Sequence, residues 1–170
     1  GFYNAGSNQQ SMSDTVMAYL CSSASPFAAV DSALGVINSV SHTGEFTFTN
    51  ASSGNYYIKL KHRNSIETWS SAAVAISGNA SYDMTSSVSQ AYGGNLIQVD
   101  SAPVRFAMYG GDVNQDGTVD ATDVSTIDND ASNFVSGYVV TDLTGDDFVD
   151  GTDFAIADNN AANFVSAITP

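Results

Sequence analysis

The chain has 170 residues, which is enough for one large domain or two small ones. Its formal net charge of −14 argues against nucleic acid and anionic membrane surfaces as partners. Only 13% of the residues are charged, so the surface must consist largely of Ser, Thr, Asn and Gly, a composition common in extracellular β-proteins. No apolar run approaches the roughly 20 residues that span a bilayer.

The N-terminal part begins with a short apolar tip, residues 1–3, followed by a flexible polar tract over residues 4–13. Residues 16–21 then alternate like a strand. Cys21 is the single cysteine, so it cannot form an internal disulfide, and we expect a buried apolar thiol.

From there to residue 109 the pattern is that of a β-protein, with apolar residues recurring at every second position and Gly, Ser and Asn turns between the runs. This spacing favours a β-sandwich. The fragment from Asn50 to Ser70 resembles immunoglobulin-like and carboxypeptidase-regulatory-like modules, in which a Gly-x-Tyr-Tyr strand is common. We therefore predict an Ig-like β-sandwich with an N-terminal extension over residues 1–109. The expected strands lie at 26–32, 34–40, 46–48, 56–60, 74–76, 82–84, 97–99 and 104–108.

Residues 112–123, DVNQDGTVDATD, have the spacing of a twelve-residue calcium loop, which supplies oxygen ligands from positions 1, 3, 5, 7, 9 and 12. Gly117 stands at position 6, where the chain must turn sharply. The expected ligands are Asp112, Asn114, Asp116, the carbonyl of Thr118, Asp120 and Asp123.

The loop is repeated thirty residues later as DLTGDDFVDGTD, residues 142–153, which indicates a duplicated unit. Asp147 replaces the turn glycine, and Asp tolerates a left-handed conformation better than most residues. The expected ligands are Asp142, the hydroxyl of Thr144, Asp146, the carbonyl of Phe148, Asp150 and Asp153.

The alternative interpretation is that both loops are acidic surface turns. Residues 110–170, however, contain twelve acidic residues and no Lys or Arg, so the module repels itself. Two bound Ca²⁺ ions would offset four of those charges. We therefore predict two calcium sites in a small α-helical module over residues 110–170. Because only the Gly110-Gly111 joint precedes the first loop, we expect this module to be docked on the sandwich.

The paired loops resemble a dockerin domain, through the DxNxDG opening, Asp at position 12, the duplication, and a single helix after each loop. The resemblance covers the last third of the chain and implies a fold built around two Ca²⁺ in a secreted protein. It also implies that loop positions 10 and 11 would contact a cohesin; these are Ala121, Thr122, Gly151 and Thr152. Cohesin-binding dockerins typically carry basic residues on the helices, and this chain has none there.

No catalytic pattern is present in the sequence, which lacks HExxH, GxSxG and a glycine-rich phosphate loop. His62 continues a strand and is expected to be structural. Tyr56, Tyr57 and Trp69 could form a sugar-stacking platform, although aromatic residues at strand spacing are more often part of a core.

We therefore predict a non-catalytic, extracellular structural protein, a calcium-stabilised subunit of a self-assembling fibre or surface structure. In this hypothesis the N-terminal segment, up to residue 13 or including residues 16–20, completes the sandwich of another copy. The alternative is a docking module that anchors a secreted enzyme or adhesin to a cohesin-like partner. A third interpretation is carbohydrate binding.

Overall fold

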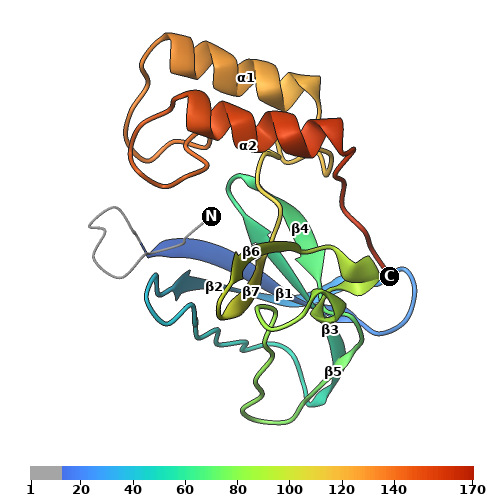
Figure 1. Ribbon diagram of the computed structural model, residues 1–170. Helices are drawn as coiled ribbons and strands as arrows, with labels where there is room; N and C mark the ends of the chain where they lie inside the picture. The colour runs from blue at the N-terminus through green and yellow to red at the C-terminus, as the bar shows by residue number, and fades with distance from the viewer. Residues whose placement is uncertain (1–12) are drawn as a thin grey trace.

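The structure is a computed structural model that describes residues 13–170, and it consists of an antiparallel β region followed by two helices (Figure 1). Residues 1–12, which hold the predicted apolar tip and most of the polar tract, lie outside the described part. The main sheet has five strands in the order β2-β1-β3-β4, with β5 also paired to β3. Its strands are β1 Asp14–Ser22, β2 Ala29–Ile37, β3 Gly54–His62, β4 Ser65–Trp69 and β5 Val74–Ile76.

A separate hairpin and two helices complete the fold. The hairpin consists of β6 Ile97–Ser101 and β7 Val104–Ala107, and two 3₁₀ turns, Val88–Gln90 and Tyr92–Gly94, precede it. The helices are α1 Ala121–Ser132 and α2 Gly151–Ala162, one after each acidic loop, as predicted. Among residues 13–170, no helix has the length and apolar character needed to cross a membrane.

Strand β1 is the centre of the β region. It contains the predicted strand 16–21 and pairs with β2 on one side and β3 on the other. Val16, Ala18 and Leu20 point to one face and are almost fully buried. Cys21 is also buried, as expected, and burial raises the pKa of its thiol. Residues 16–20 therefore belong to the sheet of their own chain in this structure. The hypothesis of strand exchange between copies is kept below for the residues that precede β1.

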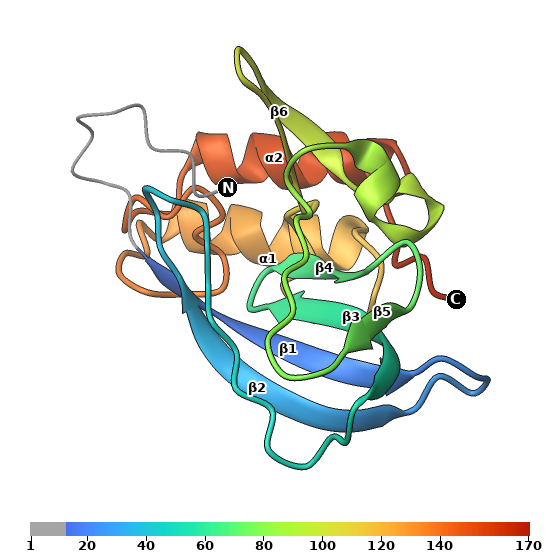
Figure 2. The ribbon, with the colours of Figure 1, turned by 90° about the horizontal axis from the view of Figure 1, so that it is seen from below.

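The strands that were expected around β1 differ in part from the prediction. The two expected strands at 26–32 and 34–40 are one strand, β2, which ends before an Asn38 turn. The expected strands at 46–48 and 82–84 are not strands in the described part of the chain, so those assignments are wrong. Figure 2 shows the chain after β2 returning beside that strand. The prediction failed there because alternation indicates a half-buried extended segment, whereas a strand also needs a partner backbone.

The two parts of the chain pack directly on each other. Ile66 of β4 is fully buried with Val119 and Val165 of the two-helix region, and Tyr109 packs against this group. The backbone continues the contact, since Ile66 N donates to the Tyr109 carbonyl over 2.9 Å. The two-helix region is therefore docked on the sheet, as the short glycine joint predicted.

Candidate metal centre

Loop 1, residues 112–123, is organised by the carboxylates at its two ends. Asp112 Oδ1 accepts from Asp116 N and its Oδ2 accepts from Gly117 N, both over 3.1 Å. Asp123 Oδ1 accepts from the N–H groups of residues 113 and 114 over 2.9 and 3.1 Å. Its Oδ2 accepts from Asp120 N over 3.1 Å, which completes a capping box at the start of α1. The loop thus closes around its first and last acidic residues.

Loop 2, residues 142–153, repeats this arrangement. Asp142 accepts from Gly145 N over 2.7 Å and from Asp147 N over 3.1 Å. Asp153 Oδ1 accepts from the N–H groups of residues 143 and 144 over 2.8 and 2.9 Å, and Asp150 with Asp153 forms the capping box of α2. The same hydrogen-bond frame therefore follows from the same residues in both copies, as expected for a duplicated unit.

Position 6 of each loop is left-handed. Gly117 has φ +92° and Asp147 has φ +70°. The prediction that Asp147 takes over the conformation of the turn glycine is therefore confirmed. A side chain in this region of backbone space costs about 1 kcal/mol or more relative to glycine. Loop 2 therefore stores strain at position 6, whereas loop 1 stores it at position 4, where Gln115 has φ +61° and loop 2 has Gly145.

The end carboxylates are buried, and none of them forms an ion pair within residues 13–170, although Lys61 of β3 lines the hollow beside Asp112 and Asp116. Asp112 is 2% exposed, and Asp123, Asp142 and Asp153 are 0% exposed. Burial raises the pKa of Asp112, hydrogen bonds from Gly117 and Asp116 oppose the rise, and the neighbouring charges of Asp123 and Asp116 add to it. Residues 110–170 contain no Lys, Arg or His. Buried carboxylates of this kind normally pair with a cation or bind a metal, so the donor set fits a hard divalent cation.

The remaining expected ligands lie nearer the surface. Asn114 and Asp116 in loop 1 bond to each other, and Asp116 Oδ1 accepts from Thr118 N over 3.0 Å. In loop 2, Asp146 Oδ1 accepts from Phe148 N over 3.0 Å. Among residues 13–170, no group of three or more His, Cys, Asp or Glu side chains is gathered closely enough to hold a metal ion. The carboxylates of either loop alone do not form such a group, and the predicted ligand sets also include the Asn114 amide, the Thr144 hydroxyl and backbone carbonyls.

Each loop is braced by the segment that follows the helix of the other repeat. Thr118 bridges to Ser166, and Phe148 bridges to Ser136. Beneath the loops lies a shared core of Val113, Ile127, Leu143, Val149 and Ala157. One loop therefore cannot rearrange without disturbing the other repeat.

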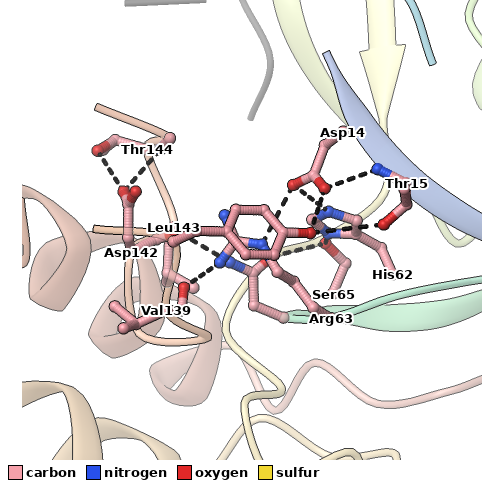
Figure 3. Close-up of polar contacts among 12 residues, drawn as sticks. Asp14, Thr15, His62, Arg63, Ser65, Val139, Asp142, Leu143 and Thr144 are labelled. Atoms are coloured by element: carbon pink, nitrogen blue, oxygen red, sulfur yellow. Dashed lines mark hydrogen bonds and ion pairs between the residues drawn. The ribbon is translucent and has the colours of Figure 1, made fainter. Parts of the chain in front are cut away.

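A second polar cluster joins β1 to the segment between the repeats (Figure 3). Asp14 is 4% exposed; it accepts from Arg63 Nε over 3.1 Å and from the Tyr138 hydroxyl over 2.5 Å. Its Oδ2 lies 3.0 Å from His62 Nε2. Burial would raise the pKa of Asp14, but the hydrogen bonds from His62 and Tyr138 outweigh it, so the pKa lies below its usual range.

Ser65, His62 and Asp14 have the composition of a nucleophilic triad, since Ser65 Oγ lies 3.3 Å from His62 Nδ1. All three are buried, and Asp14 also serves Arg63 and Tyr138. A nucleophile must be reachable by its substrate, so we interpret this cluster as a structural link. His62 thus has the structural role expected from the sequence.

The aromatic residues considered as a sugar platform are part of the packing. Trp69 is 5% exposed, and its indole N–H donates to Glu67 over 2.9 Å. Tyr57 makes edge contacts with Phe27, Trp69 and Tyr92. Trp69 therefore agrees with the core alternative that strand spacing favoured, whereas Tyr56 and Tyr57 are only half-buried.

The sequence did not identify the residues outside the two loops that hold these loops in place. Asn64 in the β3–β4 turn donates from Nδ2 to the Asp142 carbonyl over 2.9 Å, and Arg63 NH1 donates to the Val139 carbonyl. Figure 3 shows Arg63 and Val139 close to Asp142. No spacing pattern connects residues so far apart in the chain. Their only sequence signal is a polar turn directly after a strand that carries two lysines.

No protein-family model matches the chain, and a search of curated proteins finds no match. Solved structures with a similar fold include chains from two type II Cohesin-X-Dockerin complexes of Acetivibrio cellulolyticus. An N-terminal interface mutant has a TM-score of 0.48 at 15% identity, covering 89% of this chain and 85% of that chain. A C-terminal interface mutant has a TM-score of 0.52 at 15% identity, covering 95% of this chain and 92% of that chain. The similarity to the C-terminal interface mutant shows a shared fold alone. In this chain that fold is a mainly antiparallel β region with two helices.

Proposed function

We propose that the chain is a non-catalytic, extracellular structural protein that binds two Ca²⁺ and assembles with further copies of itself. The observation that carries the calcium part is the set of four buried end carboxylates, Asp112, Asp123, Asp142 and Asp153, in a region without any basic residue. Calcium takes six to eight oxygens, and each loop offers carboxylate, neutral and carbonyl oxygens at the required spacing. We propose the same twelve ligands that the loop pattern predicts.

The support for assembly comes from the segment that follows β2. Residues 44, 46 and 48 are half-buried while 45, 47 and 49 are exposed, which is the alternation of a strand, yet this segment has no strand partner among residues 13–170. It lies against β2, because a Cβ on Gly35 would come within 2.6 Å of the Phe46 ring. We interpret the β region as an Ig-like sandwich whose second sheet is incomplete.

An unpaired extended segment is a template for a strand from another chain. The N-terminal end of β1 lies beside the turn that precedes this segment, since Ser39 N donates to Ser13 Oγ over 3.3 Å. Residues 1–6 include Phe2 and Tyr3, and the polar linker of residues 7–13 would span roughly 13–16 Å as a random coil. We propose that residues 1–6 of a second copy pair with residues 44–49, which builds an open head-to-tail filament.

Electron microscopy and size-exclusion chromatography test this proposal. Filaments in Ca²⁺ should be lost when residues 1–12 are deleted, and a free peptide of residues 1–12 should raise the melting temperature of the shortened chain. The length-matched control replaces Phe2 and Tyr3 with Ser and should behave like the deletion. Filaments that persist unchanged in either variant contradict the exchange. A wild-type monomer that contains residues 1–12 in its own sheet would show that the strand adds within one chain.

A docking function is the second candidate, supported by two equivalent phenylalanines. Phe134 and Phe164 follow α1 and α2, are 89% and 88% exposed, and both have φ +54°. Large exposed aromatics at strained positions are typical of contact surfaces. The partner would be a neutral or basic surface, because the module is strongly acidic; a cohesin-like protein is one such partner. Loss of partner capture in the Phe134→Ala and Phe164→Ala variants, with filaments retained, would favour docking over assembly.

A further inference from the structure

The two loops differ at position 4. Because of this difference, the backbone carbonyl of the first residue of loop 2 accepts its hydrogen bond from a residue outside the loop. In loop 1, position 4 is Gln115, and its Nε2 donates to the Asp112 carbonyl over 2.7 Å. In loop 2, position 4 is Gly145, which has no side chain. The carbonyl of Asp142, the matching first residue, therefore has no donor from position 4 of its own loop.

The β3–β4 turn supplies that donor. Asn64 Nδ2 donates to the Asp142 carbonyl over 2.9 Å, and both residues are buried, Asn64 at 4% and Asp142 at 0% exposure. The contact thus fixes the first residue of loop 2 from a turn that lies 78 residues earlier in the chain.

The same turn holds the start of both repeats. The Asn64 carbonyl accepts from Gly111 N, next to Asp112, over 2.8 Å. Arg63 donates to the Val139 carbonyl, three residues before Asp142, and its guanidinium lies 4.5 Å from the centre of the Tyr138 ring. Arg63 is in turn held by Asp14 of β1. The turn is therefore anchored to the central strand of the sheet.

We infer that Asn64 is a positioning residue of the second calcium loop, so that loop 2 is complete only when the β region is folded beneath it. This inference rests on the proposed calcium binding. The Asp142 carboxylate can face a cation only while its backbone stays in place, and the Asn64 hydrogen bond keeps it there. In loop 1 the Gln115 side chain donates the equivalent hydrogen bond to the Asp112 carbonyl, so no donor from the β3–β4 turn is required there.

Losing the donor would leave a buried carbonyl unsatisfied, which corresponds to a loss of about tenfold or more in calcium affinity. The effect should fall on loop 2. We expect Asn64→Ala to weaken calcium binding about tenfold in an Asp112→Ala background, where only loop 2 binds, and to change it little in an Asp142→Ala background. Gln115→Ala should give the opposite pattern. Asn55→Ala, an exposed position on β3, is the control and should change neither.

A rescue variant distinguishes positioning from general damage. Gly145 has φ +74°, Gln115 has φ +61°, and a Cβ at Gly145 would meet nothing within 4 Å. Gly145→Gln should therefore restore calcium affinity to the Asn64→Ala chain by placing the loop 1 donor in loop 2. The measurement is calorimetric titration of the full chain with Ca²⁺, with circular dichroism recorded to confirm folding.

The outcomes distinguish a failure of the proposed calcium binding from a failure of the positioning role of Asn64. A wild-type chain that binds no Ca²⁺ sinks the proposed function. A wild-type chain that binds two Ca²⁺, together with Asn64→Ala binding equally well at loop 2, overturns the positioning role alone. Equal losses at both loops without rescue by Gly145→Gln also overturn it, because they indicate a general structural effect.

Discussion

Replacing Asp14 by Asn should separate the sheet from the segment between the two repeats. The change keeps the size of the side chain and removes its charge, so His62, Arg63 and Tyr138 face one neutral amide oxygen and an NH2 donor in place of two carboxylate oxygens. Breaking a buried ion pair costs 3–5 kcal/mol. Arg63 is partly exposed, so we expect a smaller loss than for a fully buried pair, about 2–3 kcal/mol in the free energy of unfolding at pH 7.

The dependence of this loss on pH has a definite sign. The folded-state pKa of Asp14 lies below its ordinary value of 3.8, so its contribution is fully present above pH 4. It declines as the pH falls from there towards the lower folded-state pKa. The difference in stability between wild type and Asp14→Asn should therefore be largest near pH 7 and should shrink below pH 4.

Urea denaturation followed by circular dichroism at pH 7, 5 and 3, in constant Ca²⁺, measures this difference. Asp128→Asn removes the same charge from an exposed position on α1 and serves as the control, with a change of about 0.5 kcal/mol or less. An Asp14→Asn variant as stable as wild type at pH 7, or a difference that grows on acidification, would refute the reasoning.

Three further outcomes follow from the loops and the helix ends. Asp112→Ala should remove the tighter calcium site and Asp142→Ala the weaker one, because the Thr144 hydroxyl in loop 2 replaces the Asn114 amide of loop 1; two equal sites by calorimetry would contradict this ranking. Asp147→Gly, at φ +70°, should stabilise loop 2 by about 1 kcal/mol, and a lower melting temperature would show that the carboxylate matters more than the strain. Phe164→Gly, at φ +54° in a Schellman helix end, should raise the melting temperature by about 1–3 °C relative to Phe164→Ala, since both variants lack the ring and differ only in the cost of a Cβ at this φ.

The features that could be predicted from the sequence are local ones. The loop frame, the helix after each loop and the left-handed Asp147 all follow from residues within twelve positions of each other. β1 was predicted because its alternation coincides with burial between two partners. In each case a short stretch of chain contains both the pattern and the contacts that satisfy it.

The features that could not be predicted depend on distant partners. Phe46 alternates with its neighbours as a strand residue does, but whether it belongs to a sheet depends on a backbone that lies elsewhere. Asn64 reaches Asp142 only because the two-helix region docks on the β3–β4 turn. Asp14 and Tyr138 are 124 positions apart. A single sequence contains no pairing information at this range, so these contacts had to come from the structure.

The most direct test of calcium-dependent folding is a pair of melting curves recorded in Ca²⁺ and in EGTA, combined with limited proteolysis. A ligand that binds only the folded state adds about 4 kcal/mol at a thousandfold excess over its dissociation constant, which at this chain length corresponds to a shift of roughly 8–16 °C. We predict a higher melting temperature in Ca²⁺, and in EGTA we predict early cleavage within residues 110–170. Coinciding curves and identical cleavage patterns would contradict the assignment of residues 112–123 and 142–153 as calcium loops.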